Sequence, residues 1–171
     1  METNKSHVEN LMIAANCNTV YHALAFNTKH HIVAYAAANS VLIMDPYHIK
    51  DSIPKVLFSL KGHTDRVNAV SWLTDRILVS ISTDKSIIVW AFNQGLDPRD
   101  PLSWTFKKVI TDAHENIINY FSTYAISDDE LYILSMCSGG TLKLWQGQSE
   151  ETIIHKGDLL FGKNLQETMA L

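Results

Sequence analysis

An internal repeat constrains the fold of this chain more than any other feature of its sequence. The segment Ser80–Trp90 (SISTDKSIIVW) aligns with Ser135–Trp145 (SMCSGGTLKLW), so that the two tryptophans are 55 positions apart. A weaker copy runs from Tyr35 to Met44, and Asp45 follows it directly. The spacing predicts three related units of about 45 to 55 residues each.

A second mark precedes each of the two tryptophans, and short β-rich runs fill the space between the marks. Gly62-His63 lies 27 residues before Trp90, and Ala113-His114 lies 31 residues before Trp145. Short runs rich in Val, Ile, Tyr, Trp and Thr, with turn-forming residues between them, are typical of strands. The predicted strands are Val20–Phe26, Ile32–Ala37, Ser40–Met44, Lys55–Leu60, Val67–Leu73, Ile77–Ser82, Ser86–Phe92, Thr105–Ile110, Ile117–Tyr124, Leu131–Cys137, Thr141–Trp145 and Glu151–His155. Four strands per unit predict an all-β propeller, because no segment is long enough for a crossover helix.

Composition and charge exclude several other classes. Hydrophobic residues make up 46% of the chain and charged residues 19%, a balance that buries a core and is not that of a disordered chain. The net charge of -4 argues against a basic nucleic-acid-binding domain, and the apolar runs are too short to cross a membrane. Two cysteines, 120 positions apart, exclude a disulfide framework. The 8 histidines lack the spacing of metal ligands, so we expect neither a metal nor a cofactor.

The repeat marks resemble those of the WD40 family of β-propellers. Gly62-His63 resembles the family's Gly-His mark, with His114 as its degenerate equivalent in the third unit. At the family's Trp-Asp position, the second and third units have the tryptophan, Trp90 and Trp145, but not the aspartate. The first unit has the aspartate, Asp45, but a methionine in place of the tryptophan. The resemblance implies a WD40 propeller.

In the second unit the resemblance extends to four side chains, His63, Ser82, Asp84 and Trp90. The family pattern implies that they form a buried, structural tetrad of hydrogen bonds. In the third unit a glycine and a cysteine replace the Asp and the Ser. Ser82, His63 and Asp84 also allow an alternative reading, as a hydrolase triad. The chain has no nucleophile turn such as Gly-x-Ser-x-Gly, so the structural reading is favoured and no catalytic residue is expected.

The marks also set the expected boundaries. Repeats are expected at 20–61, 62–111 and 112–161, with 1–19 as a possible closing strand of a last blade and 162–171 as the start of a fourth repeat. A seven-bladed ring at this repeat length needs roughly 300 residues. The expected structure is therefore an incomplete arc of about three blades and the first strand of a fourth. Such a chain is a fragment, a truncated gene model or a short isoform.

A closer resemblance, to the amino-terminal propeller of the Elongator subunit 2 family, covers nearly the whole chain. It is carried by Ser6-His7-Val8, Ile32–Pro46, Leu60–Val70 and Leu160–Leu171. It implies a non-catalytic scaffold, cytoplasmic and also nuclear, that assembles with the complex's large scaffold subunit and its acetyltransferase-like catalytic subunit in tRNA wobble-uridine modification. Direct RNA binding by this piece is not expected. The alternative is a WD40 adaptor of another assembly, such as a ubiquitin-ligase substrate receptor.

Two further features are candidates for interaction. Asn93–Ser103 lengthens the loop after the Trp90 strand, and it is either a binding segment or a tolerated insertion. Some basic residues are a candidate patch, although the sequence alone does not place them on one face: Arg66, Arg76, Lys107 and Lys108.

Overall fold

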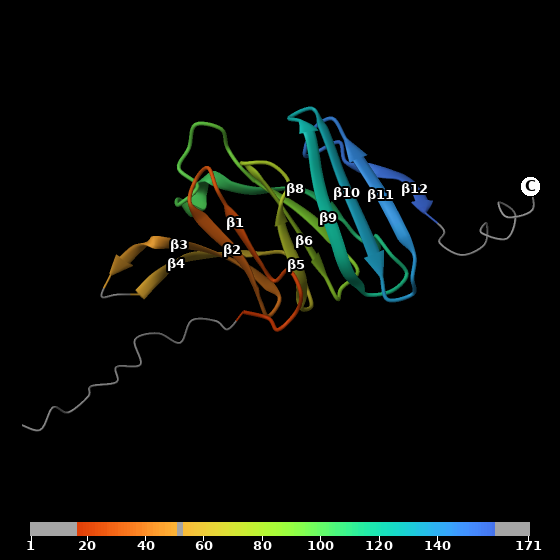
Figure 1. Ribbon diagram of the computed structural model, residues 1–171, viewed down its shortest axis with the longest axis horizontal. Coiled ribbons are helices and arrows are strands. Elements are labelled where there is room, and N and C mark those ends of the chain that lie inside the picture. The colour runs from red at the N-terminus through yellow and green to blue at the C-terminus, as the bar shows by residue number, and fades with distance from the viewer. Residues whose placement is uncertain (1–16, 51–52, 160–171) are drawn as a thin grey trace, which may run out of the picture.

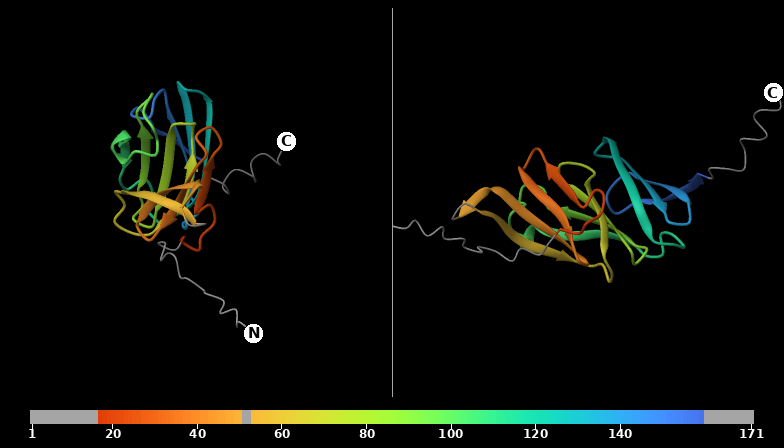
Figure 2. Two further views of the ribbon diagram at one scale, coloured as in Figure 1. Left: turned by 90° about the vertical axis from the view of Figure 1, so that its left-hand side faces the viewer. Right: turned by 60° about the horizontal axis from the view of Figure 1, so that its bottom comes forward.

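A computed structural model describes residues 17–50 and 53–159, which form three antiparallel sheets of four strands each. The sheets follow one another along the long axis of the molecule (Figures 1 and 2). The fold prediction, an all-β arc of propeller-like blades, is confirmed for these residues. The expected fourth-repeat start at 162–171 and most of the expected segment 1–19 lie outside the described residues.

Each sheet is a meander of strands that are consecutive in the chain. Blade 1 contains β1 (Leu24–Asn27), β2 (Ile32–Ala37), β3 (Ser40–Lys50) and β4 (Ile53–Lys61). Blade 2 contains β5 (Val67–Trp72), β6 (Ile77–Ser82), β7 (Ile87–Phe92) and β8 (Trp104–Ile110), with the short 3-10 helix η1 (Pro101–Ser103) before β8. Blade 3 contains β9 (Ile118–Ser127), β10 (Glu130–Cys137), β11 (Leu142–Gly147) and β12 (Ile154–Leu159).

The core lies between the blades, because both faces of the central sheet are apolar. Every residue of β6 and of β7 is buried. Alternate residues of a strand point to opposite faces, so one set packs against blade 1 and the other against blade 3. Leu78 and Ile88 belong to the cluster shared with blade 1, whereas Val79 and Val89 belong to the cluster shared with blade 3. Continuous hydrophobic runs in place of alternating ones are the expected signature of such a doubly covered sheet.

The last strand begins later than the sequence predicts. A strand is expected at Glu151–His155, whereas β12 covers Ile154–Leu159. Thr152 explains the difference, because its hydroxyl accepts hydrogen bonds from the backbone amides of Gln148 and Ser149, both at 2.9 Å. These bonds hold the residues before Ile154 in a turn.

Within the described ranges, no helix has the length and hydropathy needed to cross a membrane.

Candidate interaction surface

A buried histidine links the loop before β5 to β6 and to the turn between β6 and β7 in blade 2. His63 lies in the loop between β4 and β5, and its Nε2 is 2.8 Å from Ser80 Oγ. The indole nitrogen of Trp90 donates to the same hydroxyl at 2.8 Å. On the other side of the ring, Nδ1 lies 2.9 Å from Ser86 Oγ and 3.2 Å from Asp84 Oδ2. Both ring nitrogens therefore have partners.

The direction of these bonds follows from the groups whose roles are fixed. An indole N–H only donates, so Ser80 accepts from Trp90 and donates its own proton to His63 Nε2. The ionised Asp84 only accepts, and Ser86 Oγ donates to its Oδ1 at 2.6 Å. We therefore assign the ring proton of His63 to Nδ1. One continuous chain of donors crosses the blade from β7 to the turn between β6 and β7.

The electrostatics fit a neutral ring beside an ionised carboxylate. Burial lowers the pKa of His63 below its ordinary value, and attraction to Asp84 opposes that shift. Burial raises the pKa of Asp84, but hydrogen bonds from Ser86 and from the backbone amide of Thr64 outweigh it and lower the pKa to about 2. Asp84 is therefore charged at neutral pH, and it ties the loop before β5 to the turn between β6 and β7.

Ser82, which we expect in this network, lies outside it. Its Oγ donates to the carbonyl of Asp65 at 3.0 Å and accepts from the amide of Asp84 at 3.1 Å. Ser80 takes the expected position. Both serines point to one face of β6, but the strand register sets Ser80 diagonally opposite Trp90, and Ser82 lies about 7 Å further along the strand.

The same geometry removes the hydrolase triad built on Ser82. Ser80 and Asp84 do flank His63, as a nucleophile and an orienting acid would. However, Ser80 is 0% exposed, and its hydroxyl already accepts the indole proton of Trp90. A nucleophile must be accessible to its substrate, so this arrangement holds the loop in place and does not attack a carbonyl.

Gly62 is needed for the loop to approach Trp90. A Cβ atom at this position would lie 2.9 Å from Trp90 Cη2 and 3.0 Å from Ile88 Cδ1. Any side chain would therefore push the loop, and with it His63, away from the blade.

Blade 3 repeats only half of this network. His114, in the loop before β9, has its Nε2 2.8 Å from Ser135 Oγ, and Trp145 donates its indole proton to the same hydroxyl at 2.8 Å. Ser135 and Ser80 stand at the same distance, ten residues, before their tryptophans. Cys137, which was expected to replace the serine, is also buried and lies two residues after Ser135 on β10.

The other half of the network is missing in blade 3. His114 Nδ1 is buried and has no hydrogen-bond partner among the described residues. Gly139 stands where Asp84 stands in blade 2, and a Cβ atom there would lie 2.6 Å from the side-chain amide nitrogen of Asn116. Burial and the nearby Lys143 cation lower the pKa of His114 to about 4. The histidine of blade 3 is therefore neutral, but it lacks the carboxylate that its counterpart has.

Blade 1 is tied to blade 2 by an ion pair. Arg99, in the loop between β7 and β8, has its Nε 2.6 Å from the buried carboxylate of Asp45 on β3. Its Nη2 donates to the carbonyl of His30 at 3.1 Å. The loop at Asn93–Ser103, expected to be either a binding segment or a tolerated insertion, therefore carries an inter-blade contact.

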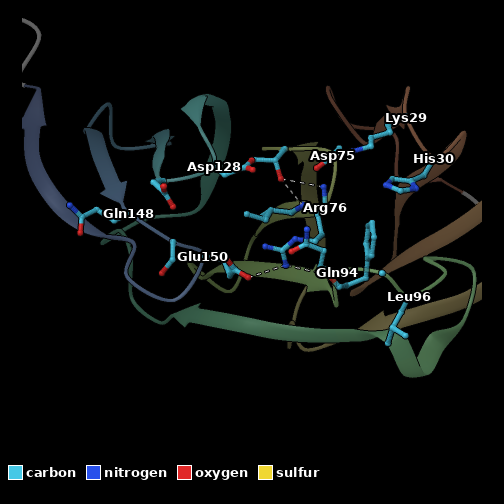
Figure 3. A pocket seen from close by; sticks show the side chains of 15 residues that line it. Lys29, His30, Asp75, Arg76, Gln94, Leu96, Asp128, Gln148 and Glu150 are labelled. Carbon is cyan, nitrogen blue, oxygen red and sulfur yellow. Dashed lines mark hydrogen bonds and ion pairs between the residues drawn. The ribbon is translucent and has the colours of Figure 1, made fainter.

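A polar pocket of about 520 Å³ lies where turns of all three blades meet (Figure 3). Arg76, in the turn between β5 and β6, donates to Glu150 Oε1 of blade 3 at 3.1 Å. Lys29, in the turn between β1 and β2, pairs with Asp75 of blade 2. Ion pairs inside this pocket thus join blade 1 to blade 2 and blade 2 to blade 3. They fix the relative positions of the turns.

Arg66, Arg76 and Lys107 do not lie together in one patch. Arg66, at the start of β5, donates its Nε proton to Asn68 Oδ1 at 3.1 Å. Arg76 lies beyond the other end of β5, in the polar pocket. Lys107 lies 3.9 Å from Glu151 of blade 3. No continuous track for a phosphate backbone follows from these positions.

Several residues of these networks were not predicted from the sequence, among them Ser80, Ser86 and Arg99. The alignment of Ser80 with Ser135, at one distance from the tryptophan, was a signal for the first. Ser86 lies two residues after Asp84, within reach of an Asx-type bond, which was a signal for the second. Arg99 bonds a residue 54 positions away, and no local pattern indicates it.

Comparisons with known proteins agree with the repeat marks. The family model "WD domain, G-beta repeat" matches residues 54–91. The chain is 30% identical to Elongator complex protein 2 of Drosophila melanogaster over 146 residues, an alignment that covers 85% of this chain. It is 28% identical to Elongator complex protein 2 of Dictyostelium discoideum over 151 residues, an alignment that covers 80% of this chain. It spans only 17% and 16% of the length of these relatives.

The fold agrees with a solved structure of low sequence identity. The crystal structure of Saccharomyces cerevisiae Sqt1 superposes with a TM-score of 0.66 at 13% identity, over 82% of this chain and 35% of that one. An identity this low supports the fold alone. Taken with the repeat marks, the three blades and the family match, these findings show that the chain is a WD40-repeat protein with distant homology to Elongator complex protein 2.

Proposed function

We propose that this chain is a non-catalytic scaffold of the Elongator complex that acts in tRNA wobble-uridine modification. The observation that carries the proposal is its similarity to Elongator complex protein 2 over 85% of the chain. In this role it contacts the large scaffold subunit and the acetyltransferase-like catalytic subunit, in the cytoplasm and also in the nucleus. It makes or breaks no bond, and it needs no cofactor.

The chemistry of the described residues supports a scaffold. The histidine networks lie inside the blades, and the hydroxyl that faces His63 is buried. In the polar pocket, Arg76 and Lys29 are already paired with carboxylates. In the parts of the chain that the structure describes, no three His, Cys, Asp or Glu side chains are grouped as metal ligands. These polar groups position turns and blade faces, on which partners can dock.

Copurification tests the proposal. The 171-residue chain, tagged and expressed in cells, is expected to bring down the large scaffold subunit and the acetyltransferase-like subunit, detected by mass spectrometry. A matched variant, His63→Ala, is expected to bring down less of both, because its blade 2 loses the network. Recovery of the folded chain, as judged by circular dichroism, without either subunit would contradict the proposal.

The adaptor alternative gains no support from the pocket at the start of β5. A ubiquitin-ligase substrate receptor of this fold would be expected to bind its substrate on a surface lined with arginines. Here a pocket of about 230 Å³ near the start of β5 contains one arginine, Arg66, beside Tyr21 and Tyr120. We therefore retain the Elongator scaffold as the proposed function.

A further inference from the structure

A groove runs along the outer side of the arc between blade 1 and blade 2. It lies between β4 and β8, which are the outermost strands of their sheets, and has a volume of about 490 Å³. We call it the outer groove; its main lining residues are Leu60, Lys61, Trp90, Trp104, Thr105 and Phe106. Both walls belong to described neighbouring blades, so the groove does not depend on any further blade.

The outer groove is apolar and aromatic. Leu60, Trp90 and Trp104 form a firmly packed floor, because each is less than a tenth exposed. Phe106 stands above that floor with 61% of its surface exposed, and its ring meets Trp90 edge-on at 6.2 Å. An exposed aromatic side chain over a rigid aromatic floor is the arrangement that anchors partner side chains at protein interfaces.

The polar features of the outer groove indicate the chemistry of the ligand that fits it. Lys61 is exposed, no acidic residue lines the groove, and no carboxylate among the described residues lies within ion-pair distance of Lys61. One backbone edge of β8 and one of β4 have no strand partner within their sheets. An extended peptide can bond to such an edge while its side chains enter the groove.

We propose that the outer groove binds an extended segment of a partner protein in which a large apolar side chain is flanked by carboxylates. The apolar side chain packs between Phe106 and the floor of the groove, and a carboxylate pairs with Lys61. The inference depends on the groove alone and does not need the Elongator assignment. Its test can therefore fail while copurification succeeds, and the reverse also holds.

A peptide is favoured over single-stranded RNA for this site. RNA needs several cations along its backbone, whereas the groove lining supplies one lysine on a chain of net charge -4. A groove with a packed apolar floor and one exposed aromatic ring suits a single anchoring side chain better than a row of stacked bases.

Two tryptophans line the outer groove, so binding can be followed by intrinsic fluorescence in the full 171-residue chain. The probe is a capped Asp-Glu-Leu-Phe-Asp-Glu peptide, titrated to millimolar concentration. We expect saturable quenching, and binding about tenfold weaker when lysines replace the acidic residues or when alanines replace Leu and Phe. Phe106→Ala and Lys61→Glu should each weaken binding of the acidic peptide about tenfold.

Matched variants away from the groove complete the design. Leu102→Ala removes an apolar side chain that is 86% exposed in η1, and Lys156→Glu reverses an exposed charge on blade 3; both should leave binding unchanged. Because Phe106 and Lys61 are exposed, their variants should keep the circular dichroism spectrum of the parent. Absence of saturable quenching, equal binding of the acidic and basic peptides, full binding by Phe106→Ala, or displacement of the peptide by oligouridine would each overturn the proposal.

Discussion

Blades 2 and 3 contain the same histidine, serine and tryptophan, yet they differ in what lies on the far side of the ring. In blade 2, His63 Nδ1 faces Asp84 and Ser86. In blade 3, His114 Nδ1 has no partner among the described residues, and Lys143 is the charge with the largest effect on the pKa of this histidine. The carboxylate, and not the histidine, therefore distinguishes blade 2, where both ring nitrogens have partners, from blade 3, where only one has.

The largest predicted difference between the blades comes from removing each histidine. His63→Ala takes partners from Ser80, Ser86 and Asp84 and leaves a cavity, so we expect a loss of about 3 kcal/mol in the free energy of unfolding. His114→Ala leaves a similar cavity but breaks one hydrogen bond, so about 1.5 kcal/mol is expected. Urea unfolding of both variants measures the difference. Equal losses would mean that the second set of bonds in blade 2 contributes nothing.

The second prediction exchanges the acid between the blades. Asp84→Ala should destabilise the chain by about 2 kcal/mol, because the hydroxyl and amide of Ser86 and the amide of Thr64 lose their acceptor. The reverse change in blade 3, Gly139→Asp, needs room that Asn116 occupies, so it is combined with Asn116→Ala.

Relative to Asn116→Ala alone, the added aspartate should raise the melting temperature and the pKa of His114, which NMR titration can follow. A stabilisation of about 1 kcal/mol is expected. An unchanged melting temperature for Asp84→Ala would remove the structural role assigned to that carboxylate.

The third prediction concerns the pH dependence of stability that His114 and Asp84 contribute. The pKa of His114 in the folded chain is lowered to about 4 from 6.5, so below pH 6.5 the unfolded chain binds a proton that the folded chain does not. Stability is therefore lost as the pH falls from 6.5 toward 4. Asp84 has a pKa lowered from 3.8 to about 2, so its contribution is present above 3.8 and is lost only as the pH falls from 3.8 toward 2.

His114 should thus cost blade 3 stability in mild acid, where Asp84 of blade 2 is still ionised. The lowered pKa of His63 acts in the same direction in blade 2, so a variant of His114 is needed to isolate the contribution of blade 3. Urea unfolding at pH 7 and pH 5 checks this, with a limiting slope of about 1.4 kcal/mol per pH unit for one proton. His114→Gln should lose less stability over this interval than the parent chain. The same pH slope in both chains would rule out His114 as the responsible group.

The smallest predicted effect concerns the contact that blade 1 has in place of a histidine network. Arg99→Ala removes the ion pair to Asp45 and the bond to the carbonyl of His30, and we expect a loss of about 1 kcal/mol. Arg99→Lys should recover part of it, because the charge remains without the forked geometry. Hydrogen exchange should show the loss mainly in β3 and β4. Uniform exchange changes over all three blades would argue against a local clamp.

The fold could be read from the sequence because its signals are local and repeated. Strand-sized runs, turn residues and the spacing of Trp90 and Trp145 sufficed to predict the sheets of blades 2 and 3. Alternation does not separate Ser80 from Ser82, since both lie on one face of β6. The equal spacing of Ser80 and Ser135 from their tryptophans was the one sequence signal, and the register of β6 on β7 decides for Ser80. The Arg99–Asp45 pair and the polar pocket arise from contacts between segments that are distant in the sequence, and no local pattern encodes such contacts.

Hydrogen exchange of the two buried indole N–H groups tests the contrast between the blades most directly. Trp90 and Trp145 each donate to a buried serine at 2.8 Å, so their direct bonds are equal and only the far side of the histidine differs. We predict that the indole proton of Trp90 exchanges at least about tenfold more slowly than that of Trp145, and that Asp84→Ala removes this gap. Equal rates in the parent chain, or faster exchange at Trp90, would contradict the account.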